Sequence, residues 1–151
     1  MTWVDDCIIF TKDLSIVTNI LELLKQDFDV ELEENLEDGD VSRYLGMEIV
    51  RNSDKTFEIK QPFLIDRILQ LLEIDDKVNP KSTPVSKPLL HKDKDGEPRV
   101  RKWKYRTAIG MLNYLTASTR PDIAMAVHQC ARFSNDPKLT HERAVIRIGK
   151  Y

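Results

Sequence analysis

Two adjacent carboxylates, Asp5 and Asp6, are the residues in this chain whose chemistry stands out. They separate two short runs that favour β-strand, residues 2–4 and 7–10, so the pattern predicts a β-hairpin with the two carboxylates at its tip. Neighbouring carboxylates repel each other unless a cation lies between them or one is protonated. Because Mg²⁺ takes one or two protein carboxylates, a magnesium site is one interpretation. An ordinary solvated acidic turn is the other.

A second candidate site is the basic segment RVRKWKYR, residues 99–106, in which cations alternate with flat rings. This mixture suits a phosphate backbone and its bases. The alternative is a solvated charged linker that leads into a helix. The candidate nucleic-acid-binding residues of this segment are Arg99, Arg101, Lys102, Trp103, Lys104 and Arg106.

Charge is segregated along the chain although the formal net charge is only −2. Residues 27–40 include eight acidic residues and no basic one. Residues 77–106 include seven lysines and three arginines against three acidic residues. A polyanion would therefore be attracted to the later part of the chain and repelled by the earlier part.

The composition of the 151 residues, 41% hydrophobic and 32% charged, is typical of a soluble globular protein with about one core. No signal peptide or membrane span is expected, because no apolar run is long enough. The two cysteines make no disulfide framework, and His128 and Cys130 would point to different faces of a helix. We therefore expect no zinc site and a reducing compartment.

The pattern of apolar residues predicts an α+β fold, with strands early and helices late. A candidate cap at Asp13 precedes the first helical pattern. Pro62 opens another helix, as favoured in a first turn. Helices are predicted over residues 14–27, 62–72, 104–118, 121–133 and 140–151, with Pro121 and Thr140 as start signals for the last two. Strands are predicted over residues 28–33, 43–52 and 56–61, with a polar turn at 52–55.

The order and spacing of several motifs resemble the back half of a copia-type LTR-retrotransposon reverse transcriptase. These motifs are WVDDCIIF, RYLGMEIV, STPVSKPL, YRTAIGMLNYLTASTRPDIAMAVHQCARF and HERAVIRIGKY. Any one of these motifs is weak evidence for the family, but the ordered set is specific to it and covers nearly the whole chain.

The resemblance implies a right-hand polymerase that copies RNA into DNA with two Mg²⁺ ions. Asp5 would be the principal catalytic metal ligand and Asp6 the more peripheral one. Trp3 stands where the family usually has Tyr or Phe, which keeps a flat ring near the template and primer. The expected partners are an RNA template and a DNA primer, in an intracellular, cytoplasmic particle and without a membrane.

The same resemblance places a primer grip at Leu45, Gly46 and Met47. A glycine inside a strand commonly marks a place where another backbone comes close, which agrees with that role. The alternative is a β-bulge or simple packing, with Leu45, Met47 and Ile49 facing the core.

The implied organisation is a partial palm at 1–60, a thumb helix at 61–74, a basic proline-containing linker at 75–103 and a helical thumb and connection region at 104–151. The family's third catalytic carboxylate and its fingers lie upstream of the hairpin, and its RNase H domain lies downstream. We therefore expect this chain to be inactive alone and to depend on those parts of the same polyprotein. The alternative function is a non-catalytic, nucleic-acid-binding remnant of a transposon.

Overall fold

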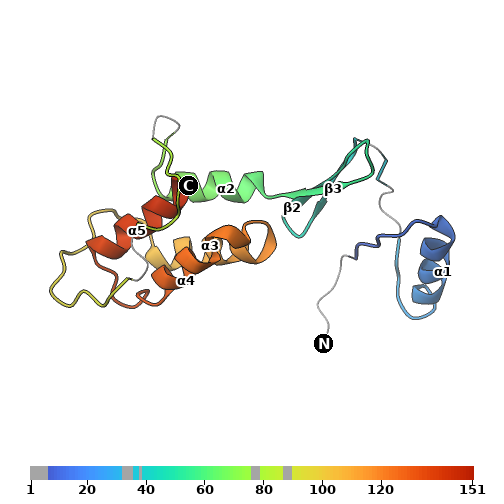
Figure 1. The fold of residues 1–151 in the computed structure, drawn as a ribbon. Helices are drawn as coiled ribbons and strands as arrows, with labels where there is room; N and C mark the ends of the chain where they lie inside the picture. The colour runs from blue at the N-terminus through green and yellow to red at the C-terminus, as the bar shows by residue number, and fades with distance from the viewer. Residues whose placement is uncertain (1–6, 32–35, 38, 76–78, 87–89) are drawn as a thin grey trace. The chain divides into compact units, whose positions relative to one another are not determined.

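The computed structural model has an α+β fold (Figure 1) and describes residues 7–31, 36–37, 39–75, 79–86 and 90–151. The chain divides into two compact units, Met1–Lys60 and Gln61–Tyr151. The first unit contains α1 (Leu14–Leu24), β1 (Val41–Tyr44), β2 (Met47–Arg51) and β3 (Phe57–Lys60). The second contains α2 (Pro62–Leu71), α3 (Tyr105–Ser118), the 3₁₀ helix η1 (Pro121–Ile123), α4 (Ala124–Ala131) and α5 (Leu139–Gly149). The predicted fold class is confirmed.

Helix α1 begins at the predicted cap. The Asp13 carboxylate accepts a hydrogen bond from the backbone N–H of Ser15 at 2.9 Å, which satisfies one donor of the first turn. This bond holds the pKa of Asp13 below its usual value. Only Val17 of the helix is buried, and Leu14 and Leu23 are exposed, so α1 keeps part of its apolar surface open to solvent.

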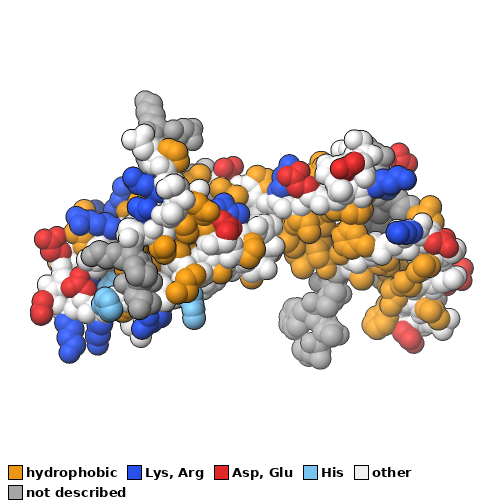
Figure 2. Space-filling view, viewed as in Figure 1, with side chains coloured by type: hydrophobic (Ala, Val, Ile, Leu, Met, Phe, Trp, Pro, Cys, Tyr) orange, Lys and Arg blue, Asp and Glu red, His pale blue; other side chains and the backbone are white. Residues whose placement is uncertain are grey.

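The three strands form one antiparallel sheet in the order β1-β2-β3. Ile49 of β2 lies opposite Ile59 of β3, and side chains two residues apart share a face. The exposed Phe57 and Ile59 therefore lie on the same face as the buried Ile49, and Figure 2 shows hydrophobic side chains gathered on one side of this sheet. The ring of Phe10 meets that of Phe57 edge-on, 5.0 Å between centroids.

Two predicted strands are not formed. Residues 7–10 and residues 28–31, the described part of the predicted strand 28–33, have no strand structure. Each run has the composition of a strand, but a strand also needs a neighbour to which its backbone can hydrogen-bond. In the described part of the chain, β1, β2 and β3 pair only with one another.

The described residues of the second unit form an apolar core, in which α3 packs against α2, α4 and α5. Its most deeply buried side chains include Leu72, Ala108, Leu112, Val127 and Val145. The predicted helices are confirmed to within a few residues. Helix α5, however, begins at Leu139 rather than Thr140, because Lys138 occupies the cap position.

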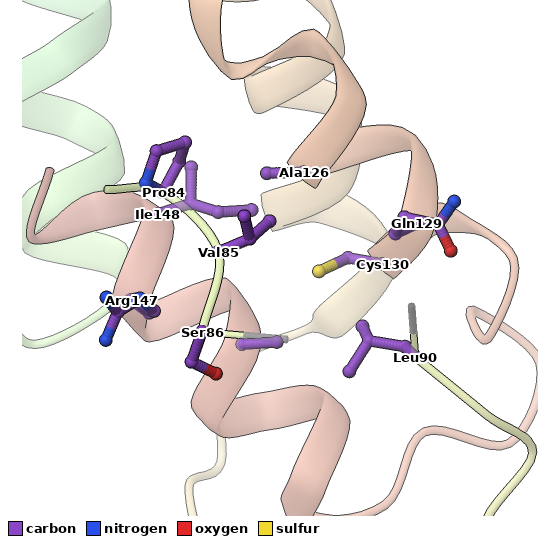
Figure 3. A pocket seen from close by; sticks show the side chains of 10 residues that line it. Pro84, Val85, Ser86, Leu90, Ala126, Gln129, Cys130, Arg147 and Ile148 are labelled. Atoms are coloured by element: carbon purple, nitrogen blue, oxygen red, sulfur yellow. The ribbon is translucent and has the colours of Figure 1, made fainter. Parts of the chain in front are cut away.

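Residues of the predicted linker lack regular helix or strand in their described part, yet they pack against the helices. The guanidinium of Arg147 donates to the carbonyl and hydroxyl oxygens of Thr83 at 3.1 and 2.9 Å. Figure 3 shows a small apolar hollow between this segment, α4 and α5, with the Cys130 sulfur directed into it near Val85 and Leu90. Across the described residues, we find no helix with the length and apolarity needed to span a bilayer.

Candidate functional site

The predicted primer-grip residues form a tight hairpin turn rather than the interior of one strand. Tyr44 of β1 pairs with Met47 of β2, so Leu45 and Gly46 are the two turn residues. Their φ angles, 48° and 74°, are both positive, as a type I′ turn requires. The prediction of a single strand over 43–52 is therefore wrong, and Gly46 serves the turn conformation instead of a bulge.

The turn places its three residues in different environments. Leu45 is 58% exposed at the tip, whereas Met47 is half-buried in the sheet. An added Cβ at Gly46 would meet no atom within 4 Å, so the space beside it is open. The tip of the turn, with Leu45 exposed and open space beside Gly46, is therefore accessible to another molecule.

The predicted metal ligands Asp5 and Asp6, and the predicted ring Trp3, lie outside the described residues. The donor chemistry of two adjacent carboxylates fits Mg²⁺, which prefers oxygen ligands. Within the described ranges, no group of three or more His, Cys, Asp or Glu side chains is close enough to hold a metal ion.

The basic segment at 99–106 is built around a buried carboxylate, Glu142 of α5, whose side chain is 2% exposed. Its Oε2 accepts hydrogen bonds from Arg99 Nε at 3.2 Å and from the Arg101 backbone N–H at 3.1 Å. The Arg99 guanidinium also lies 4.3 Å over the Trp103 ring and donates to the Trp103 carbonyl at 2.6 Å. Arg99 is thus a structural cation, neutralised by Glu142.

Both rings of the basic segment are buried, so neither offers a free face for base stacking. Trp103 is 6% exposed and Tyr105 is 4% exposed, and their rings stack at 5.8 Å. The Tyr105 hydroxyl donates to the Cys130 carbonyl at 3.0 Å. Burial raises the pKa values of the Tyr105 hydroxyl and the Cys130 thiol, the latter to about 12.

Two further arginines of the segment are also engaged in the fold. Arg101 donates through Nη1 to the Leu72 carbonyl at 2.6 Å, and so caps the end of α2. Arg106 donates to the Ser134 carbonyl and to the Asn135 side chain. The six candidates therefore do not form one open patch.

Within the described structure, Lys102 and Lys104 are the two residues of the basic segment whose side chains are exposed and make no hydrogen bond or ion pair. They belong to a strongly basic unit. Residues 61–151 contain seventeen Lys and Arg against ten Asp and Glu, a net charge of +7, whereas residues 1–60 contain six against fifteen, a net charge of −9. Blue side chains are accordingly prominent on the second unit in Figure 2.

Glu142, which the sequence did not single out, organises the basic segment. Asp122, expected from the sequence to offset a helix dipole, instead forms a forked pair with Arg120, with N–O distances of 2.9 and 2.8 Å. The guanidinium holds the pKa of Asp122 below its usual value. The Arg-x-Asp spacing at 120–122 could have suggested this pair, but no local signal connects Glu142 to a segment about 40 residues earlier.

The relatives that comparison finds over the whole length of the chain are Pol polyproteins of transposons. Over its whole length it is similar to retrovirus-related Pol polyproteins, which supports a segment of a copia-type Pol polyprotein. One relative is that of the transposon TNT 1-94 from Nicotiana tabacum, 30% identical over 158 residues. Another is that of the transposon RE1 from Arabidopsis thaliana, 30% identical over 151 residues.

The chain spans only about a tenth of each of these relatives, 11% and 10%, while the matches cover 100% of the chain. A shorter match, 43% identical over 47 residues, is to the secreted RxLR effector protein 161 of Plasmopara viticola and covers 31% of the chain and 33% of that protein. No family model and no solved structure matches.

Proposed function

We propose that this chain is the part of a retrotransposon reverse transcriptase that runs from the catalytic hairpin into the thumb and connection. The observation that carries the proposal is the match to transposon Pol polyproteins, which covers the whole chain, including residues 1–10 and 45–47. A match confined to the helices would not have included the two carboxylates.

In this proposal Asp5 and Asp6 hold magnesium in the intact enzyme. When bound, two Mg²⁺ ions activate the primer 3′-hydroxyl and stabilise the leaving pyrophosphate. Leu45, Gly46 and Met47 position the primer end, and the exposed tip of the β1–β2 turn suits that contact. The proposed partners are an RNA template and a DNA primer, and the proposed location is an intracellular particle.

Grafting tests the catalytic assignment. The matched segment of the TNT 1-94 Pol polyprotein is replaced by these 151 residues, and RNA-templated primer extension is measured with Mg²⁺. We expect extension by the chimera and its loss in Asp5→Asn, whereas Glu22→Gln on α1 leaves it unchanged. A chimera that extends primers equally well with Asp5→Asn would overturn the assignment.

Metal binding by the chain itself provides a second test that does not depend on the graft. Mn²⁺ broadens the NMR signals of nearby nuclei, so it should broaden those of residues next to the hairpin carboxylates. The double variant Asp5→Asn/Asp6→Asn should lose this broadening. Equal broadening in the parent and the double variant would show that these carboxylates hold no metal.

A second candidate function is nucleic-acid binding without catalysis. The observation that favours it is the net charge of +7 on the second unit, with Lys102 and Lys104 exposed on the basic segment. The two candidates differ in one outcome. A chimera that binds an RNA–DNA hybrid but never extends the primer favours the second.

A further inference from the structure

The first turn of α5 is bonded to the segment formed by residues 91–98, which lies about 50 residues earlier in the sequence. The Leu139 backbone N–H donates to the Glu97 carbonyl at 2.9 Å. The Thr140 hydroxyl donates to the Asp93 carboxylate at 3.0 Å. His141, the next residue, contacts the same segment through its ring, so three successive residues of one helical turn hold the 91–98 segment.

The ring of His141 is 1% exposed and has a partner on each nitrogen. The Lys138 backbone N–H donates to Nδ1 at 2.9 Å, and Nε2 lies 3.0 Å from the His91 carbonyl oxygen. A backbone N–H can only donate, so Nδ1 carries no proton, and Nε2 carries the proton that it donates to His91. The ring also stacks on Phe133, 4.2 Å between centroids.

We infer that His141 is a proton-sensitive latch, and that its protonation releases the 91–98 segment from α5. A second proton must go to Nδ1, where it would face the Lys138 N–H. That hydrogen bond is then lost, and a buried cation is left without a new acceptor. The bond to His91 and the neighbouring bonds of Leu139 and Thr140 weaken as the turn adjusts.

The charged groups around the ring offer no compensating contact. Glu142 is bonded to Arg99 and Arg101, and Asp93 accepts from Thr140. Among the described residues, no carboxylate is hydrogen-bonded to the His141 ring. The titratable and charged groups of the elements around the latch are Lys138, Glu142, Asp136, His91, Asp93, Glu97 and Arg99, together with Arg132 at the end of α4, which lies over the Phe133 ring.

Release would change what the second unit presents to solvent. The 91–98 segment carries Lys92 and Lys94 beside Asp93 and Asp95. When the 91–98 segment detaches, the first turn of α5 is uncovered. The exposed Arg143 follows that turn in the sequence. Protonation would thus alter the basic surface close to the Arg99–Glu142 pair.

Amide exchange measured by NMR tests the latch, because Lys138 and Leu139 are donors in it. Their exchange rates, each divided by the intrinsic rate, are compared at about pH 7.5 and about pH 5.5, because a lower pH favours the released turn, in which Nδ1 is free to take the second proton. We expect a relative rise of about fivefold at the lower pH, the factor that corresponds to about 1 kcal/mol for one net hydrogen bond.

Two variants separate the latch from other effects of pH. His141→Gln keeps an acceptor for Lys138 but does not titrate, so its relative rates should be the same at both pH values. The double variant His91→Gln/His128→Gln removes the other two histidines and should behave like the parent. The inference is overturned by a pH-independent parent, by loss of the effect in the double variant, or by its persistence in His141→Gln. If His141→Gln does not fold, the double variant still decides.

Discussion

Arg99 and Glu142, forty-three residues apart in the sequence, form an ion pair at 3.2 Å in which the carboxylate is 2% exposed and the arginine side chain 18% exposed. The same carboxylate oxygen holds the backbone of Arg101. A pair this deeply buried is costly to break from one side, because the remaining charge stays in a poorly solvated place.

We expect Glu142→Ala to lower the free energy of unfolding by about 3 kcal/mol, since Arg99 would be left without its partner. Glu142→Gln should lower the free energy of unfolding by less, because the amide oxygen can still accept a hydrogen bond from the Arg101 N–H. Urea denaturation followed by circular dichroism measures both. Arg143→Ala, an exposed neighbour on α5, is the control and should change stability by no more than about 0.5 kcal/mol. Equal losses for Glu142→Ala and Arg143→Ala would contradict the structural role.

The β1–β2 turn leads to a prediction about two adjacent positions. Gly46→Val should destabilise the hairpin by about 1–2 kcal/mol, because a side chain with a branched β-carbon disfavours positive φ. Leu45→Asn should not, since Asn is favoured in a type I′ turn. NMR contacts between β1 and β2 report the hairpin in each variant. The turn assignment fails if Gly46→Val retains these contacts as fully as Leu45→Asn.

Nucleic-acid binding should depend on the lysines of the basic segment more than on its arginines and rings. For a single-stranded oligonucleotide, Lys102→Gln/Lys104→Gln should reduce the slope of log affinity against log salt by about 1.4, at about 0.7 for each lost phosphate contact. Fluorescence anisotropy across a salt series measures it. Lys12→Gln/Lys25→Gln on the acidic unit is the matched control and should leave the slope unchanged. If Lys102→Gln/Lys104→Gln leaves the slope unchanged, these two lysines do not contact phosphate.

Trp103→Ala should act through stability rather than through lost base stacking. The ring is buried against Tyr105 and under Arg99, so its removal creates a cavity that costs about 3–5 kcal/mol. Thermal unfolding measures the effect, and anisotropy below the lowered melting temperature measures binding. If Trp103→Ala keeps the parent's stability but loses affinity, the ring contacts nucleic acid after all.

The two cysteines should differ sharply in reactivity. Cys7 is exposed, whereas burial raises the pKa of Cys130 from 9.0 to about 12. A thiol-specific reagent should label Cys7 quickly and Cys130 only on unfolding, and Cys7→Ser should abolish the fast phase. Because the folded-state pKa is the higher one, stability is complete below about pH 9 and declines as pH rises toward 12. Cys130→Ala should flatten that decline.

The helices could be predicted from the sequence because their signals are local. The cap at Asp13 and the proline at position 62 each lie beside the apolar pattern that they introduce. The strands were harder, since residues 7–10 have the right composition but no neighbour in the described structure. The pattern predicts strand at Leu45 and Gly46, because the turn lacks the usual Asn-Gly or Asp-Gly pair.

The candidate site was predictable only in part, for an electrostatic reason. Counting cations in residues 99–106 gives a basic patch, but the count does not show which charges are already neutralised. The charge of Arg99 is neutralised by Glu142 of α5, and the guanidinium of Arg101 is hydrogen-bonded to the Leu72 carbonyl. Such pairings depend on tertiary packing. Lys102 and Lys104 are exposed, and their contact with nucleic acid stays a prediction.

The opposite charges of the two units affect how the protein would be handled and detected. The sequence isoelectric point of about 5.9 suggests an anionic protein that an anion exchanger should retain at neutral pH. Yet residues 61–151 would, as a separate proteolytic product, be retained by a cation exchanger. Affinity for heparin or phosphocellulose therefore follows the local charge of one unit, and an isoelectric-focusing gel would give no hint of it.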